Sequence, residues 1–487
     1  MALSRGEVRA GVADSRWRLV SPGVAVGDHW RFRPLTVVRV ALVLMLVGQL
    51  GRIPVLPTGT GDAPLLVNDL CVMTMIAAGV MSGLVSQSLR IDRVAGIALL
   101  FAALGGISAV LSVPKYGLSA FELLASTAYL ARWVVYLGIY VVVINVVRSD
   151  DVMTLWHTLE ATMLVFAAFG IIQAIFIPHF AQVVYPESRV WIDWDEQGNR
   201  LVSTVLEPNI AGGMIILTLI VQLAQLAGGE RVALWKPSLM FAAQVATLSR
   251  SSFVALFVAG VIILAVRGVS RRMLRFGALI GVAIAAASPK LIQYAQAYTK
   301  LEVDASAMTR VTNWLRAIRV FADNPIIGVG FNTFGYVGES YGWPRKGLAG
   351  NSTDGGLLFI AVMTGVVGLT LYLWMLAAVV HRCRRVWRDQ ATSQAFRSLA
   401  VGIGAATVAI CVQSFFVNSL LTVFVMEPLW ILWGIASILA WSIRPTPMIR
   451  PLAQLVAMPA ATSDRDRRTL HPGGGMPRSA PPRRSIP

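Results

Sequence analysis

The sequence is poor in charged residues, cysteine and histidine, from which soluble surfaces and metal sites are largely built. Only 14% of its 487 residues are charged, whereas about 25% is usual for a soluble domain. None of its three cysteines, Cys71, Cys383 and Cys411, has a partner at metal-ligand spacing, and Cys383 is expected in a basic loop. These absences exclude a disulfide framework and a zinc-binding cysteine motif.

Motifs that carry catalysis in many soluble enzymes are also absent. The sequence has no glycine-rich phosphate-binding loop, no His/Glu zinc pattern and no Gly-x-Ser-x-Gly. Nothing therefore indicates nucleotide hydrolysis, and we expect no cofactor and no metal. The energy for a reaction then has to come from the substrate or from a gradient.

What the chain has in excess is apolar residues in long runs. Hydrophobic residues make up 56% of it, with a mean hydropathy of +0.66. A helix needs about 20 such residues to cross a ~30 Å hydrocarbon core. The fold class we predict is an all-α integral membrane bundle of about twelve transmembrane helices. The predicted spans are 35–50, 65–86, 94–113, 121–147, 152–178, 203–227, 233–248, 252–266, 273–288, 355–380, 398–417 and 422–443.

The net charge of +17 follows the predicted topology. Most of the excess arginine lies in an arm, 1–34, in a tail, 446–487, and in two loops, 267–275 and 382–388. All of these fall on one side of the membrane domain 35–445, as the positive-inside rule requires. Both termini are therefore expected in the cytoplasm, and no nucleic acid is expected as a partner. The tail is rich in Pro, Arg, Gly and Ser, a composition typical of disorder.

A long loop, 289–353, is predicted on the outer side and is basic, against the topological trend. Within it, 306–323 has the periodicity of an amphipathic helix. Its apolar stripe is Val311, Leu315, Ile318 and Ala322. Asn324-Pro325 is expected to end this helix.

Charged residues at the outer ends of predicted spans are the candidates for chemistry. Arg200 and Glu207 precede the Pro208-Asn209 helix start, and Arg250 lies in the tight polar turn 247–252. Arg310 lies in the amphipathic helix, and Asp354 opens the tenth span. Structural alternatives stay open, since Asn209 and Asp354 suit helix capping and Arg250 suits snorkelling.

Arginine and carboxylate together suggest how an anionic substrate could be handled at the membrane surface. Guanidinium groups bind phosphate oxygens in pairs, and a carboxylate can accept the proton of a hydroxyl. Arg132, inside the fourth span, is costly there unless paired, and structural pairing is the expected role.

These segments resemble the O-antigen ligase and polymerase superfamily, which includes the Wzy-type polysaccharide polymerases and the WaaL-like ligases. The resemblance covers residues 200–373 and depends on the order and spacing of several short pieces. They are Arg200 with Pro208-Asn209, Leu248-Ser249-Arg250, Arg310 with Trp314, Asp323-Asn324-Pro325-Ile326-Ile327-Gly328-Val329-Gly330, and Gly365-Val366-Val367-Gly368.

The resemblance implies an inverting, metal-independent glycosyl transfer at the outer leaflet of a bacterial plasma membrane. The donor would be a polyprenyl-diphosphate-linked glycan, attacked by a sugar hydroxyl. Arg200 and Arg250 would bind the diphosphate with help from Arg310, and Asp354 or Glu207 would be the base. The ligases carry a histidine where this chain has Asp354, which favours polymerisation of repeat units into a surface polysaccharide or exopolysaccharide. Membrane lipids, and a regulator of chain length, are the further partners that the resemblance suggests.

Other functions remain open at this point. A ligase would move the same glycan onto another acceptor. A transporter or flippase of lipid-linked sugars would also bind diphosphate, but it predicts polar helix breaks on both sides of the membrane. A peptidoglycan polymerase of the septum-and-elongation group and a scaffold without activity are weaker alternatives.

Overall fold

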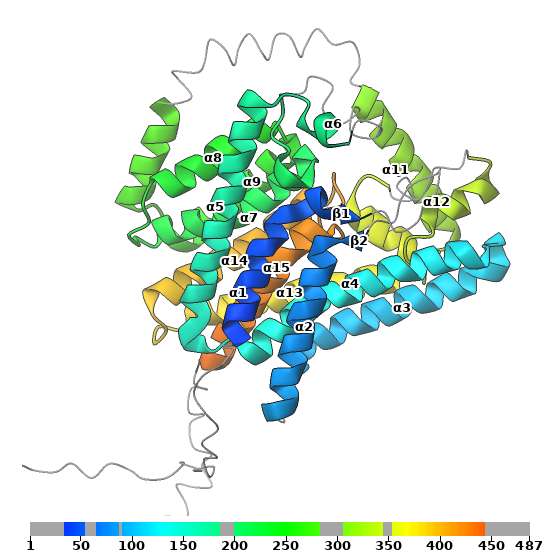
Figure 1. The fold of residues 1–487 in the computed structure, drawn as a ribbon, viewed down its shortest axis with the longest axis horizontal. Helices are drawn as coiled ribbons and strands as arrows, with labels where there is room; N and C mark the ends of the chain where they lie inside the picture. The colour runs from blue at the N-terminus through cyan, green and yellow to red at the C-terminus, as the bar shows by residue number, and fades with distance from the viewer. Residues whose placement is uncertain are drawn as a thin grey trace, which may run out of the picture. The chain divides into compact units, whose positions relative to one another are not determined.

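The computed structural model describes residues 34–53, 65–86, 90–185, 199–282, 305–343 and 353–443 (Figure 1). The basic arm up to residue 33, the tail from residue 444 and parts of the predicted outer loop lie outside these ranges. The predictions made for the arm and the tail therefore stay predictions.

The described chain is helical except for one short hairpin. The main helices are α1 (Pro34–Leu44), α2 (Val67–Ser86), α3 (Arg93–Tyr116), α4 (Ala120–Val146), α5 (Val152–Phe176), α6 (Phe180–Val184), α7 (Pro208–Ala227), α8 (Trp235–Thr247), α9 (Arg250–Arg267), α11 (Ala305–Asp323), α12 (Phe334–Val337), α13 (Gly356–Arg388), α14 (Gln394–Gln413) and α15 (Val423–Ser442). Residues 271–282 are also helical. Short 3₁₀ helices occupy Met45–Gly51, Ser149–Asp151, Ser203–Val205 and Gly338–Tyr341, and strands β1 (Arg52–Ile53) and β2 (Leu65–Leu66) pair antiparallel.

Eight helices of the described ranges are long and apolar enough to cross a membrane, which makes this a multi-pass membrane protein. They are α3, α4, α5, α7, α9, α13, α14 and α15. Each of the other four predicted spans contains helix, but α8 has only 13 residues and α1 only 11. The total of twelve spans stays a prediction. The small hairpin is a departure from the all-α prediction.

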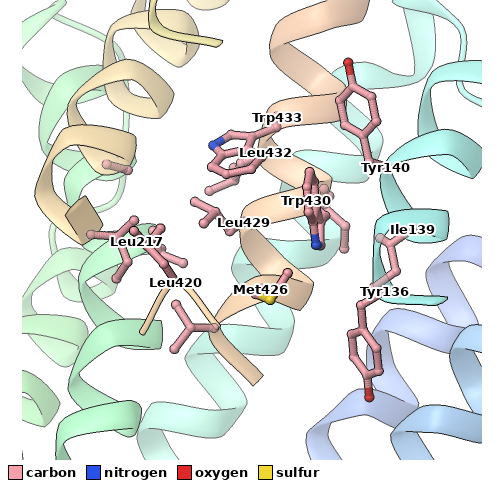
Figure 2. Close-up of a cluster of buried hydrophobic side chains, with 14 of the residues drawn as sticks. Tyr136, Ile139, Tyr140, Leu217, Leu420, Met426, Leu429, Trp430, Leu432 and Trp433 are labelled. Carbon is pink, nitrogen blue, oxygen red and sulfur yellow. The ribbon is translucent and has the colours of Figure 1, made fainter. Parts of the chain in front are cut away.

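Helices α7 and α15 form the centre of the bundle, because both are apolar on all sides and almost wholly buried. In Figure 2, Trp430 and Trp433 of α15 lie between Tyr140 of α4 and Leu217 of α7. The two indole rings meet edge to face, with 4.8 Å between their centroids. Large aromatic side chains therefore fill the space where these helices meet.

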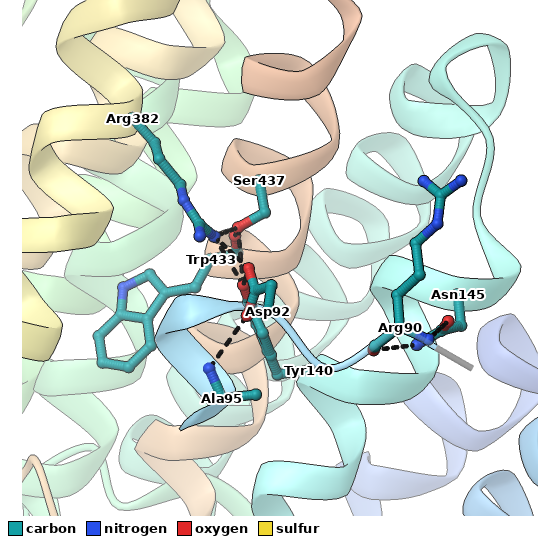
Figure 3. Close-up of polar contacts among 8 residues, drawn as sticks. All are labelled: Arg90, Asp92, Ala95, Tyr140, Asn145, Arg382, Trp433 and Ser437. Atoms are coloured by element: carbon teal, nitrogen blue, oxygen red, sulfur yellow. Dashed lines mark hydrogen bonds and ion pairs between the residues drawn. The ribbon is translucent and has the colours of Figure 1, made fainter. Parts of the chain in front are cut away.

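A buried ion pair joins three helices away from the candidate residues (Figure 3). Arg382 Nη1 of α13 lies 2.6 Å from Asp92 Oδ2, at the start of α3, and Tyr140 Oη of α4 donates to the same carboxylate at 2.6 Å. The interpretation of 382–388 as a basic loop is therefore wrong. These residues continue α13 to Arg388, Arg382 is mostly buried, and Cys383 is buried inside the helix.

Two other charged residues inside predicted spans also have partners. Arg132 Nη2 lies 2.8 Å from Asp69 Oδ2, which confirms the expected pairing. Lys236 Nζ lies 2.6 Å from Glu160 Oε2 of α5. A paired lysine explains how the short, polar segment of α8 can stay in the bundle, since an unpaired charge there would cost several kcal/mol.

Helix α13 is broken at Gly365, and an irregular segment, 325–331, fills the break. Gly365 has a φ of 63° and a ψ of −168°, outside the helical region. Two intrahelical hydrogen bonds are lost there, and the segment supplies replacements on both sides. The N–H groups of Val329 and Gly330 donate to the carbonyls of Val362 and Met363, and those of Val366 and Val367 donate to the carbonyls of Pro325 and Ile326, over 2.8 to 3.3 Å.

Close approach of the segment requires glycine at several positions. A Cβ at Gly365 would overlap the carbonyl of Ile326, and one at Gly330 would overlap the backbone of Ala109 in α3. Phe331 N–H also donates to the carbonyl of Gly105 in α3, at 3.3 Å. The glycines that the sequence places in 325–331 and 365–368 are therefore structural, and they attach the outer loop to α3 and α13.

We predict that Gly365→Ala destabilises the protein, because the new methyl group would push the segment out of the break and leave backbone groups unpaired. The cost should be at least about 2 kcal/mol. Gly260→Ala in α9 is the matched control, since a Cβ there meets no atom within 4 Å. Thermal unfolding in detergent measures both, and equal melting temperatures would contradict the role of the break.

Candidate functional site

The turn between α8 and α9 holds two of the predicted arginines. Leu248 takes the left-handed conformation, Ser249 is the N-cap residue, and Arg250 is the first residue of α9, with its side chain exposed. Arg200 reaches the same turn, since its Nε donates to the carbonyl of Thr247 at 3.0 Å. The structure therefore brings Arg200 and Arg250 to one place, although they are 50 positions apart in the sequence.

Glu207, not Asn209, is the cap of α7. Its Oε1 accepts from the backbone and side-chain N–H groups of Asn209 at 3.1 and 2.9 Å, and its Oε2 accepts from the N–H of Ile210. Burial raises the pKa of the Glu207 carboxyl, and these hydrogen bonds and the charge of Arg200 partly offset that rise. The predicted span from residue 203 in fact begins as helix at Pro208, after a 3₁₀ turn.

A buried network of polar side chains joins the start of α7 to the turn before α9. Ser249 Oγ donates to Asn209 Oδ1 at 3.0 Å and lies 2.9 Å from Ser252 Oγ. Gly212 permits this approach, because a Cβ there would meet the Ser252 hydroxyl. Asn209 and the Leu-Ser-Arg turn, separate pieces in the sequence, are thus parts of one arrangement.

Gln413, the last residue of α14, connects this network to the following loop. Its Nε2 donates to the carbonyl of Asn209 at 3.0 Å and to Ser252 Oγ at 2.7 Å, and its Oε1 accepts from Ser419 at 2.8 Å. The side chain is fully buried. Sequence reasoning missed Gln413, although a glutamine closing an apolar run at the outer end of a span is a signal of a functional or pairing residue.

Asp354 lies two residues before the start of α13, and that start contacts the loop that follows Gln413. The N–H groups of Gly356 and Leu357, at the start of α13, donate to the carbonyls of Val417 and Ser414. Gly355 is the N-cap residue and has a φ of 99°, and a Cβ there would lie 2.8 Å from the carbonyl of Phe415. Asp354 is therefore not the cap of α13, and the capping interpretation of this carboxylate is wrong.

The amphipathic helix α11 contacts Asp354 through two consecutive residues. Asn313 Nδ2 donates to Asp354 Oδ2 at 3.1 Å, and Trp314 Nε1 donates to the Asp354 carbonyl at 2.7 Å. Arg310 precedes these residues by three and four positions, so it lies on the same face of α11. The third predicted arginine thus shares a helix face with the contacts to Asp354.

The predicted residues form two groups. One contains Arg200, Glu207 and Arg250, and the other contains Arg310 and Asp354. Gln413 bonds to Asn209 and Ser252, which neighbour the first group, and the loop after it contacts Gly356 and Leu357, which neighbour Asp354. Within the described ranges, no three His, Cys, Asp or Glu side chains are arranged to hold a metal ion. The arrangement offers arginine side chains next to the polar network of Asn209, Ser249 and Ser252. It offers a carboxylate next to Asn313 and Trp314 of α11.

Part of this site lies in a region of the chain that matches a known protein family. Residues 237–373 match the family model described as O-antigen ligase. The match includes Arg250, Arg310 and Asp354, as well as the 325–331 segment and Gly365, and it begins after Arg200 and Glu207. No curated protein matches the chain.

We predict that Gln413→Ala loosens the start of α7 and the turn before α9. It removes three buried hydrogen bonds and leaves their partners unpaired, a change worth about 1–3 kcal/mol of stability. Gln394→Ala, at the exposed first residue of the same helix, should cost much less. Thermal unfolding in detergent compares them, and a Gln413 variant as stable as the Gln394 variant would refute the linking role.

Proposed function

We propose that this enzyme of the O-antigen ligase family, identified by residues 237–373, polymerises lipid-linked glycan repeat units at the outer leaflet of a bacterial plasma membrane. Membership of the family itself implies glycan transfer of the ligase or polymerase type from a lipid-linked donor. The finer statement about polymerisation is supported by the site described above and by the residue at its tenth-span entrance.

The reaction we propose is a single inverting displacement. A sugar hydroxyl oxygen of one glycan forms a bond to the anomeric carbon of another. The bond from that carbon to the diphosphate oxygen breaks, and its electron pair leaves with the polyprenyl diphosphate. The hydroxyl proton passes to a carboxylate. The energy comes from release of the diphosphate, so no nucleotide is consumed.

Arg200 and Arg250 are the groups we assign to the leaving diphosphate. Both are positioned by the same turn, Arg200 through Thr247 and Arg250 through the cap at Ser249. Guanidinium groups held in place stabilise charge as it develops on the leaving oxygen, with little reorganisation. Arg310 would approach from α11 and assist. Metal independence follows as an expectation from this role, since fixed cations can replace a metal ion.

Asp354 is a better base than Glu207. Both oxygens of Glu207 already accept hydrogen bonds at the start of α7, which suits a residue that positions the chain. In the described part of the structure, the Asp354 carboxylate accepts one side-chain hydrogen bond, from Asn313 to Oδ2. We assign the hydroxyl proton to its Oδ1, and Asn313 orients the group.

The family domain supports transfer over the transporter alternative. Between polymerase and ligase, the observation that favours polymerase is the aspartate at position 354, where the ligases resembled by this sequence carry histidine. A ligase acting on another acceptor is the second candidate, and it would use the same donor and the same arginines.

A reconstituted assay tests the proposal. We predict that protein in liposomes, given a polyprenyl-diphosphate oligosaccharide with EDTA and no nucleotide, yields a ladder of longer glycans and free polyprenyl diphosphate. Arg250→Ala should insert normally and give no ladder. Donor that stays intact with folded wild-type protein would favour a ligase that needs another acceptor, or a transporter. A normal ladder from Arg250→Ala would remove the diphosphate role of this residue.

We predict that Asp354→Asn lowers the transfer rate by about 100-fold or more, since removal of a general base typically costs that much. The asparagine keeps the size of the side chain and an oxygen that can still accept from Asn313. Asp323→Asn is the matched control. The Asp323 carboxylate is exposed, lies at the C-terminal end of α11 and accepts a hydrogen bond from Tyr341. Single-turnover rates separate the two variants, and an unchanged rate for Asp354→Asn would leave it a structural residue.

A further inference from the structure

Helix α11 packs on the bundle with the face opposite to its apolar stripe. Ala317 and Val320 are fully buried, and Trp314 and Asn313 contact Asp354. The stripe predicted from the sequence, in contrast, points away: Leu315 is 64% exposed, Ile318 51% and Val311 46%. A row of large apolar side chains on an outer helix needs a partner that excludes water.

The residue that follows α11, Asn324, lies at the C-terminal end of α3, a candidate membrane span. Asn324 Oδ1 accepts hydrogen bonds from Lys115 Nζ at 2.6 Å and from Tyr116 Oη at 2.9 Å, and these are the last residues of α3. Lysine and tyrosine at the end of a span are typical of the membrane interface. The end of α11 is therefore at the level of the lipid head groups.

Exposed apolar side chains also occur after α11 and on a candidate membrane span next to it. Ile326, which follows α11, is 65% exposed, and its carbonyl bonds to the N–H of Val367 at the break of α13. Val366 and Val367 are themselves exposed on α13, a candidate membrane span. Exposed apolar side chains therefore occur on α11, at Ile326 and on the part of α13 that Ile326 contacts.

The flank of the stripe carries charge and aromatic rings. The Arg316 guanidinium lies 5.3 Å from the centre of the Trp343 ring, and Arg319 lies 5.5 Å from that of Tyr341. The two rings stack, with centroids 5.0 Å apart. Arginine beside an apolar stripe, with tryptophan and tyrosine next to it, is the composition of a helix that lies in a membrane interface.

We propose that α11 is an interfacial helix, with Val311, Leu315 and Ile318 buried among the lipids of the outer leaflet. A lipid surface is the occupant because α11 ends beside α3 and leads, through the exposed Ile326, to exposed apolar side chains of α13, and both helices are candidate membrane spans. This proposal needs only that the protein spans a membrane, and it is independent of the proposed glycan transfer. Its consequence is that Arg310, on the other side of α11, is held at the depth of lipid head groups.

Site-specific fluorescence tests the proposal in the full-length protein. Cys411→Ala provides the background, since Cys71 and Cys383 are buried. An environment-sensitive fluorophore is attached at Leu315→Cys or Ile318→Cys, with Ser340→Cys as the control on an exposed residue outside α11. The variants are placed in liposomes of phosphatidylethanolamine and phosphatidylglycerol. Quenching is measured with a nitroxide carried near the head-group end of the lipid acyl chain and with a water-soluble paramagnetic complex.

The probes at 315 and 318 should shift to shorter emission wavelength and lose more than about half of their emission to the lipid nitroxide. The control at 340 should respond mainly to the soluble quencher. Quenching of all three positions from water would overturn the proposal. Protection from both quenchers, together with energy transfer between labelled copies, would also overturn it and assign the stripe to a second copy of the chain. Neither readout depends on glycan transfer, so the two proposals can fail separately.

Discussion

The break in α13 is the constraint on which the placement of α11 and of the residues around Asp354 depends. In a membrane, backbone N–H and C=O groups that leave a helix must find partners inside the protein, because lipid offers none. Gly365 releases two pairs of such groups, and the irregular segment 325–331 provides partners for all four. These hydrogen bonds fix the position of the segment. They also fix the end of α11, which directly precedes the segment. The contacts of Asn313 and Trp314 with Asp354 follow from that position.

Charged and polar side chains are distributed by the same requirement. Asp92 with Arg382, Asp69 with Arg132, and Glu160 with Lys236 each join two helices that are distant in the sequence. Removing one member of such a pair would leave a charge in a poor solvent, so each pair also fixes which helices are neighbours. Closer to the outer surface, the network of Asn209, Ser249, Ser252 and Gln413 follows the same rule with neutral groups.

The arginines and the carboxylate of the candidate site lie on different elements of the bundle. The turn between α8 and α9 presents two arginines, whereas the entrance of α13 presents a carboxylate oriented by α11. Gln413 at the end of α14 bonds to Asn209 and Ser252 near the arginines, and the loop after it bonds to the start of α13. In the proposed reaction, the leaving group and the proton acceptor would therefore be supported by different elements. If α11 also lies in the interface, the arginine it contributes sits at the depth where a lipid-linked diphosphate would arrive.

The sequence by itself determined the class of protein and singled out the charged residues on which the proposed function depends. Long apolar runs can be satisfied only by membrane helices, and arginine next to proline, asparagine or serine at their outer ends has few structural uses. The sequence also located α11 and the glycines of the 325–331 segment. Only the tertiary structure decided that Glu207 caps α7, that Asp354 does not cap α13, that Arg382 is buried, and that Gln413 joins the start of α7 to the turn before α9. The physical reason is that periodicity and capping patterns report local geometry, whereas the partner of a buried polar group is chosen by helices that meet only in the folded bundle.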